Sequence, residues 1–159
     1  EKIGLEHIGG CGSLVAVAII ADTLDRGKWQ RAGFNGMMLP VLEDSILARR
    51  AQEGLLSIKD LLLYSTICGT GLDTIPLAGD TTLEQLEAVI MDIAVLSVRL
   101  DKPLTARLMP IPGKKAGDRT TFEFEYFANS RVIPLEGQKI SFPVKADQSI
   151  QLIPRHKSK

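Results

Sequence analysis

Apolar and polar positions along the chain predict four helices. The clearest comes after Thr81 and Thr82, either of which offers an N-cap, and Glu84 stands three positions beyond Thr81. Another begins with Ser57-x-x-Asp60, the spacing of a capping box. The predicted helices cover residues 13–27, 42–54, 57–67 and 80–102.

Short apolar or alternating runs predict the extended segments. Those bounded by glycine or proline read as strands, and residues 139–153 alternate polar and apolar residues as a small hairpin would. The other predicted extended segments are residues 32–41, 72–77, 104–111, 121–127 and 130–135. Strands that alternate with helices indicate an α/β protein.

The small number of predicted strands indicates that this chain alone does not form a complete barrel. A chain of 159 residues is enough for one globular domain, yet its few strands are too few to close a barrel. We expect residues 1–137 to be part of an α/β barrel domain and residues 138–159 to be an extended or hairpin extension with a basic tail. Because the chain begins at Glu1 in what reads as the middle of a domain, we expect a piece of a longer protein.

Charge and cysteine content narrow the class of protein. The formal net charge is zero, which argues against a dedicated nucleic-acid binder. The longest apolar run, residues 13–20, is too short to cross a bilayer, so we expect no membrane partner. Two cysteines without a Cys-x-x-Cys motif favour a reducing, cytoplasmic setting.

Three long motifs resemble one family of uncharacterised proteins whose full chains run to several hundred residues. They are "GFNGMMLPVLED", "YSTICGTGLDTIPLAGDTT" and "RLDKPLTARLMPIPGKKAGD", and the resemblance extends to "FANSRVIPLE". The chain looks like the C-terminal part of such a protein. The resemblance implies a large α/β barrel similar to that of pyruvate formate-lyase. It does not imply glycyl radical chemistry, because "SRVIPL" has isoleucine and proline where the radical glycine would stand.

Arg107 is the strongest candidate for a binding residue. In the strand predicted over 104–111, Leu104, Ala106 and Leu108 share one face, and Arg107 lies on the other. A guanidinium next to an apolar helix needs an anion or water. In a wide barrel, Arg107 would point into the lumen and bind a carboxylate. The alternative is a salt bridge to a structural carboxylate.

Two carboxylates follow or begin predicted strands. Glu43 comes after the strand predicted over 32–41, where it could act as an acid or base, although acidic residues also simply favour helix starts. Asp73 lies at the start of the strand predicted over 72–77 and is a second candidate for proton transfer.

Three further candidates lie in glycine-rich stretches. Cys68 precedes Gly-Thr-Gly and is either a nucleophile at a loop tip or a small buried residue that closes a helix. Lys114 and Lys115, in "PGKKAGD", could assist in holding a carboxylate or phosphate, or could form a solvated loop paired with Asp118. These stretches match neither a dinucleotide-binding fingerprint nor a P-loop.

The sequence assigns no metal ligands and no cofactor. Its two histidines and two cysteines are too far apart for a zinc site, while an oxygen-ligated divalent ion stays open. The leading hypothesis is an enzyme-like barrel that binds a small anionic metabolite through Arg107, Lys114 and Lys115, with Glu43, Asp73 or Cys68 as catalytic groups. The alternatives are a non-catalytic scaffold or assembly protein, and a subunit that completes a barrel. Either a homo-oligomer or association with the rest of the barrel is expected.

Overall fold

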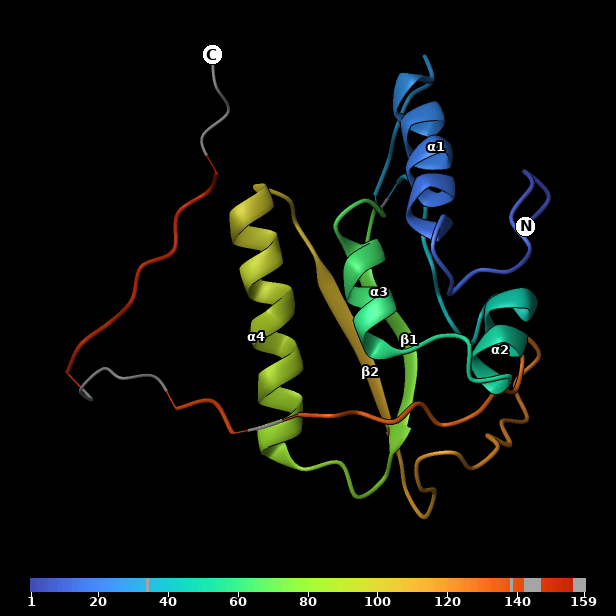
Figure 1. Ribbon diagram of the computed structural model, residues 1–159, viewed down its shortest axis with the longest axis vertical. Helices are drawn as coiled ribbons and strands as arrows, with labels where there is room; N and C mark the ends of the chain where they lie inside the picture. The colour runs from blue at the N-terminus through green and yellow to red at the C-terminus, as the bar shows by residue number, and fades with distance from the viewer. Residues whose placement is uncertain (34, 138, 142–146, 156–159) are drawn as a thin grey trace.

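The computed structural model describes residues 1–33, 35–137, 139–141 and 147–155. It is a mixed α/β structure with a small parallel sheet (Figure 1). The elements in chain order are α1 (Ser13–Arg26), α2 (Ser45–Gln52), α3 (Ile58–Ser65), β1 (Gly71–Ala78), α4 (Leu83–Leu100) and β2 (Thr105–Ile111). None of the helices in the described ranges combines the length and hydropathy that a membrane span requires.

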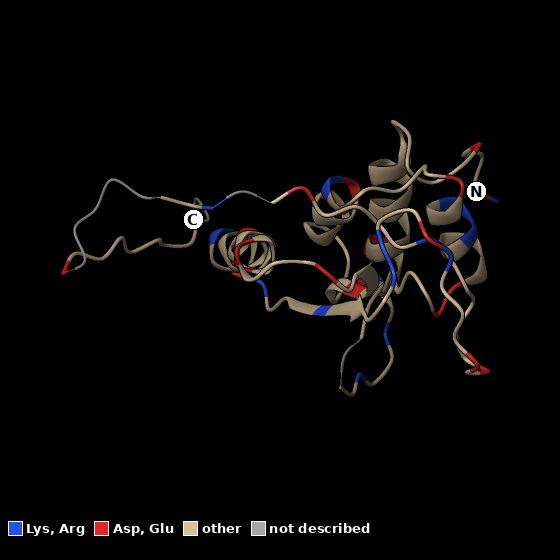
Figure 2. Cartoon of the chain, turned by 90° about the horizontal axis from the view of Figure 1, so that it is seen from below, with Lys and Arg blue, Asp and Glu red and all other residues tan. Residues whose placement is uncertain are grey.

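The centre of the structure is the unit formed by β1, α4 and β2. The two strands pair in parallel, with Gly71 opposite Thr105 and Ala78 opposite Ile111. Helices α3 and α4 lie side by side against one face of this sheet (Figure 1), and in Figure 2 the helices gather on that side of the strands. The sheet therefore has one helix-covered face and one face without a helix in the described part of the chain.

The hydrophobic core lies between β1 and the helices. Leu72, Ile75 and Leu77 of β1 are fully buried, and they pack in one cluster with Tyr64 of α3 and Ile93 of α4. Strand β2 is less covered: its Ala106 and Leu108 are only partly buried against this cluster. β1 is consequently the central element and β2 an edge of the described structure.

Helix ends follow local sequence signals. The Ser57 and Asp60 capping box forms as predicted at the start of α3. At α4 the box lies one residue later than predicted: Thr82 is the N-cap and Gln85, not Glu84, is its partner. After α2, Gly54 adopts φ +79°, and the backbone N–H groups of Gly54 and Leu55 donate to carbonyls of the last turn.

Three predicted extended segments are not strands. Over residues 32–41 the described backbone pairs with the sheet only at Pro40, which bridges Asp73, while residue 34 lies outside the described residues. Residues 121–127 form a turn, not an edge strand, and residues 130–135 join only one isolated bridge, Arg119 to Arg131. The prediction over residues 121–127 fails because the alternation of Phe and Glu reflects an aromatic cluster of Phe122, Phe124, Tyr126 and Phe127 and not a sheet face.

The side chain of Asn129 holds this aromatic turn together. Its Oδ1 accepts from the backbone N–H of Phe122 at 2.7 Å and from the hydroxyl of Thr120 at 2.8 Å. Its Nδ2 donates to the carbonyl of Phe122 at 3.1 Å. Such side-chain to backbone bonds offer the chain an alternative to strand pairing.

The hairpin predicted over residues 139–153 falls partly outside the described residues. Its described parts, 139–141 and 147–153, adopt no strand. The last residues of the basic tail, 156–159, also lie outside the described residues. Close to that tail, Arg99 of α4 donates from Nη1 to the carbonyl of Ile153 at 2.6 Å, so the described end of the chain contacts α4.

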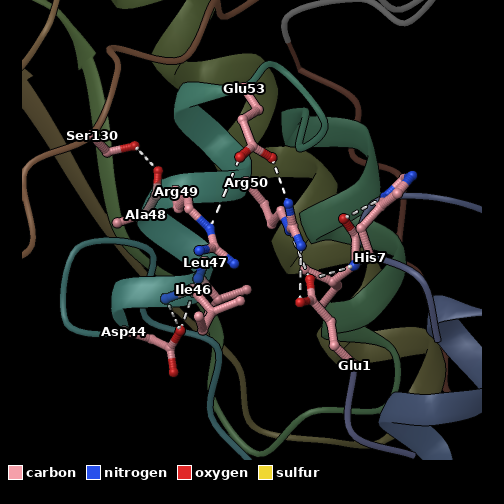
Figure 3. A network of polar contacts seen from close by, with 11 residues as sticks. Glu1, His7, Asp44, Ile46, Leu47, Ala48, Arg49, Arg50, Glu53 and Ser130 are labelled. Carbon is pink, nitrogen blue, oxygen red and sulfur yellow. Dashed lines mark hydrogen bonds and ion pairs between the residues drawn. The ribbon is translucent and has the colours of Figure 1, made fainter. Parts of the chain in front are cut away.

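An arginine of α2 holds the N-terminal segment in place. Arg50 donates from Nε and Nη2 to the two carboxylate oxygens of Glu1, at 2.7 and 3.0 Å, and from Nη1 to Glu53 at 2.7 Å (Figure 3). The backbone N–H of Ile8 also donates to Glu1, at 3.3 Å. Hydrogen bonding from Arg50 lowers the pKa of Glu1 from 4.5 to about 2.

The lowered pKa of Glu1 predicts acid-induced release of this segment. A carboxylate with a depressed pKa stabilises the folded arrangement above its unfolded pKa, and that contribution is lost as the pH falls from 4.5 towards 2. Hydrogen exchange at Ile8, relative to its intrinsic rate, should therefore rise over this pH range. In Glu1→Gln the same exchange should already be fast at pH 7. Protection of Ile8 that is the same in both proteins at every pH would contradict the role of this ion pair.

A second prediction concerns the loss of stability when Gly71, which lies where β1 meets β2, is replaced. Its φ is +112°, and a Cβ at this position would lie 2.3 Å from the carbonyl oxygen of Thr105. Gly113 is a matched control, since its φ is +75° and a Cβ there would meet nothing within 4 Å. Gly113→Ala should cost about 1 kcal/mol for the left-handed backbone alone. Gly71→Ala should cost about 1–3 kcal/mol more because of the clash, measured by urea unfolding. Equal losses would show that the close approach of the strands does not matter.

Candidate functional site

Arg107 projects from the face of the sheet that no described helix covers. Its neighbours Ala106 and Leu108 turn towards the core, so alternation along β2 directs Arg107 the other way. The side chain is 54% exposed. The face assignment made from the sequence therefore agrees with the structure.

Two of the predicted carboxylates meet at this arginine. Arg107 donates from Nε to Oδ1 of Asp73 on the neighbouring strand, and its Nη1 lies 3.0 Å from Oε1 of Glu43. The Asp73 side chain is only 5% exposed, whereas that of Glu43 is 34% exposed. In Figure 2 the blue band on β2 and the red band on β1 lie close together. We call Arg107, Asp73 and Glu43 the Arg107 cluster.

An irregularity in β1 positions Asp73. The register of the two strands shifts between Leu72 and Ile75, and Thr74 at this bulge has φ +45°. The extra residue lets Leu72 and Ile75 both face the core while Asp73 reaches Arg107 on the open face. A left-handed threonine is uncommon, so the surrounding structure must hold it in place.

The segment before α2 carries Glu43 to the cluster. The N–H of Val41 donates to the carbonyl of Asp73 at 3.0 Å, and the N–H of Leu42 donates to the hydroxyl of Thr74 at 3.1 Å. A tight turn follows, in which the N–H of Glu43 donates to the carbonyl of Pro40. The bulged threonine thus anchors the residue next to Glu43, a role that the sequence did not reveal.

The electrostatics of the cluster favour a permanently charged arginine. Hydrogen bonding to Asp73 first, and to Glu43 second, raises the pKa of Arg107 above its ordinary value. Two carboxylates around one guanidinium leave the cluster with one excess negative charge. Among the described residues, Nη2 of Arg107 donates no hydrogen bond.

The chemical capacity of the three groups follows from their burial. Asp73 is almost fully enclosed and bound, so it can orient the guanidinium but has little access to a ligand. Glu43 is reachable from solvent and lies beside the arginine, where a carboxylate could accept or release a proton. The half-exposed edge of Arg107 can donate to a carboxylate or phosphate.

The other three predicted site residues lie elsewhere. Cys68 is fully buried in the turn between α3 and β1, where its Sγ accepts from the N–H of Gly71 at 3.3 Å. This places it before the start of β1, whose third residue is Asp73, and no hydrogen bond or ion pair among the described residues joins Cys68 to the Arg107 cluster. The buried helix-closing residue described as the alternative for Cys68 matches this position.

Lys114 and Lys115 follow the end of β2. The carbonyl of Lys114 accepts from the N–H of Gly79, and the N–H of Lys115 donates to Asp118 at 2.7 Å. Lys115 also lines a cavity of about 320 Å³ near the start of α4, together with Asp80. Within the described ranges, no hydrogen bond or ion pair joins either lysine to the Arg107 cluster.

Side chains that could bind a metal ion do not gather in the described part of the chain. Among the described residues, no three His, Cys, Asp or Glu side chains come together. Glu43 and Asp73 are the only two carboxylates bound to Arg107 in that part of the chain, and the arginine supplies the positive charge between them.

Comparison with known proteins finds relatives of unknown function. The sequence model of the family described as "Uncharacterised ACR (DUF711)" matches residues 1–139. A UPF0210 protein of Pyrobaculum aerophilum is 38% identical over 122 residues, which cover 74% of this chain and 27% of that protein. A UPF0210 protein of Syntrophobacter fumaroxidans is 37% identical over 126 residues, covering 77% of this chain and 28% of that protein.

A UPF0210 protein of Listeria monocytogenes matches a longer stretch. It is 34% identical over 142 residues, which cover 87% of this chain and 31% of that protein. The chain thus spans less than a third of the length of these curated relatives. No solved structure matches the chain.

The burial of the Arg107 cluster predicts an asymmetric response to mutation. Arg107→Met leaves a carboxylate in a nearly dry site without its cation and should cost about 3–5 kcal/mol of unfolding free energy. Asp73→Asn leaves a half-exposed guanidinium that water can solvate, so it should cost less. Adding Asp73→Asn to Arg107→Met should recover most of the loss. Urea unfolding of the two single variants and the double variant measures this cycle. Additive losses would show that the two side chains are not coupled.

Proposed function

The chain belongs to the family of uncharacterised proteins described as DUF711, and from that starting point we propose that its Arg107 cluster binds the carboxylate or phosphate of a small anionic metabolite. The observation that carries this proposal is that Arg107 is both held in place and exposed. Its Nε is held by the buried Asp73, while 54% of the side chain is exposed, on the face of the sheet that no described helix covers. A guanidinium oriented in this way can bind a planar anion with little further loss of conformational freedom.

Glu43 supplies the chemistry in this proposal. It is the more exposed of the two carboxylates and lies 3.0 Å from the Nη1 of Arg107. An anionic ligand that binds Arg107 would compete with Glu43 for the guanidinium. The displaced carboxylate would then stand beside the ligand as a proton acceptor. Asp73, proposed from the sequence as a catalytic group, takes the role of a positioning residue.

A barrel similar to that of pyruvate formate-lyase would give this site its enclosure. In the described ranges the sheet has only two strands, and α3 and α4 cover one of its faces. In the proposed barrel the other face, which carries Arg107, would line the lumen. The relatives are more than three times as long as the stretch they share with this chain and could supply the remaining strands.

Exposed apolar residues on α4 support association with further protein. Met91, Val95 and Val98 recur at helical spacing and are exposed, on a different side from the buried Val89 and Ile93. A helix that is apolar on two sides normally packs on two sides. This observation favours the remaining barrel or a second copy as the partner, and it also suits the alternative of a scaffold or barrel-completing subunit. We place the protein in the cytoplasm, in line with its two free cysteines.

Cys68, Lys114 and Lys115 have smaller parts in the proposal. The buried Cys68 would act only if the turn before β1 opened. The two lysines, at the carboxyl end of β2, would attract an anion towards the sheet without touching it.

Arg107→Lys in the full-length protein tests the binding role. The variant keeps the charge but loses the planar fork, so affinity for inorganic phosphate, malonate or succinate should fall about tenfold or more in isothermal titration calorimetry. Arg49→Lys is a matched control, because Arg49 is 55% exposed and also pairs with a carboxylate, Glu53. It should leave these affinities unchanged.

Two results would overturn the proposal. One is a wild-type protein that binds none of the three anions at millimolar concentration. The other is an Arg107→Lys variant that retains its fold by circular dichroism and binds them as the wild type does.

A further inference from the structure

A second cavity lies on the opposite side of the sheet from Arg107. It has a volume of about 370 Å³ and is bounded by α3, α4 and residues 131–137. In Figure 1 this last segment is the orange trace that passes below α3, across the lower ends of β1 and β2, towards the start of α4. The volume falls at the lower end of the range for small-molecule sites, roughly 300–1,000 Å³.

Arg131 lines this cavity without a partner. Its backbone is held in place, because the N–H of Val132 donates to the carbonyl of Asp118 at 2.8 Å and that of Ile133 donates to Pro76 at 2.8 Å. Its side chain is partly buried, and it makes no hydrogen bond or ion pair with any other residue that the structure describes. Taking a guanidinium partly out of water without an anion is unfavourable, so the cavity is suited to an anionic group.

Gly54 makes room for this guanidinium. The point that a Cβ of Gly54 would occupy lies 3.1 Å from Nη1 of Arg131. The arginine therefore lies directly against the backbone at the end of α2, on the wall of the cavity.

Asp92 of α4 also lines the cavity and carries the opposite charge. It is exposed, and across the described residues it has no hydrogen bond or ion pair, including none with Arg131. The other charged pair at the rim, Lys59 and Glu136, is already matched at 3.1 Å. The unmatched charges in the cavity are thus one cation on residues 131–137 and one anion on α4.

The rest of the lining is largely apolar. Leu56, Leu62 and Leu135 contribute aliphatic surface, and the core residues Ile58, Val89 and Ile133 add to it. An apolar body placed here would be removed from water, and its burial would contribute about 25 cal/mol for each Å².

We infer that this cavity binds a small zwitterion with an apolar side chain, of the type of an aliphatic amino acid. The ligand's carboxylate binds Arg131, its ammonium group binds Asp92, and its side chain packs on the leucines. No simpler class satisfies the three features together: a plain anion leaves Asp92 unmatched, and a plain apolar molecule leaves both charges unmatched. The site is independent of the Arg107 cluster, because it lies on the helix-covered side of the sheet.

Isothermal titration calorimetry of the full-length protein with leucine, valine, methionine and phenylalanine tests the inference. At least one should bind with millimolar affinity or better. For the amino acid that binds, the N-acetyl derivative loses the cation and the amide loses the anion, so each should bind about tenfold more weakly or worse. If none of the four binds, or if either derivative binds as well as the parent, the inference is wrong.

Variants assign the two charges. Arg131→Gln should weaken binding of the amino acid about tenfold or more, but it should leave the weak binding of the amide unchanged, because the amide lacks the carboxylate. Asp92→Asn should likewise weaken binding of the amino acid and leave the weak binding of the N-acetyl derivative unchanged, because that derivative lacks the ammonium group. Lys59→Gln, at the rim, should change affinity less than threefold. Arg107→Lys should have no effect on this ligand, which separates the cavity from the proposed anion site. The comparison of ligand derivatives needs no variant, so it remains decisive if Arg131→Gln does not fold.

Discussion

The carboxylate of Asp73, the third residue of β1, is almost fully buried, and an ionised group in that position requires a cation. Arg107 meets this requirement, and the parallel pairing of β2 with β1 brings it to Asp73. The helix α4 makes the connection long enough for that parallel pairing. The ion pair therefore links the register of the sheet, the bulge at Thr74 and the position of the candidate site.

The two candidate binding sites lie on opposite sides of the sheet. On its open face the Arg107 cluster has one guanidinium held by a buried carboxylate and accompanied by an exposed one. On its helix-covered side the cavity between α3 and α4 is lined by apolar residues and by an arginine and an aspartate, and neither of these two side chains pairs with another described residue. Because the two sites share no residue, a ligand at one could alter the other only through β1 and the segment of residues 131–137, which is hydrogen-bonded to β1 through Ile133 and Pro76.

The family assignment leaves the chemistry open, since the relatives are themselves uncharacterised. The comparisons do show how much of the relatives this chain corresponds to: it covers less than a third of their length. The exposed apolar side of α4 and the short sheet are the features on which the proposed association with further protein rests. The ion pair of Arg50 with Glu1 shows that the described part nevertheless holds its own N-terminal segment in place.

The sequence by itself determined the helices and the two paired strands, because the signals for them are local. The capping box at Ser57 acts within one turn, and the spacing of apolar residues identified α4 and the face of β2 that carries Arg107. Only the tertiary structure decided which extended runs pair: residues 32–41 meet the sheet at one bridge, and Asn129 closes residues 121–127 into a turn. It also decided that Arg107, Asp73 and Glu43 meet while Cys68 and the two lysines do not. These contacts join residues that are far apart in the sequence: Glu43 is 30 positions from Asp73 and 64 positions from Arg107. No local sequence pattern encodes contacts at that separation.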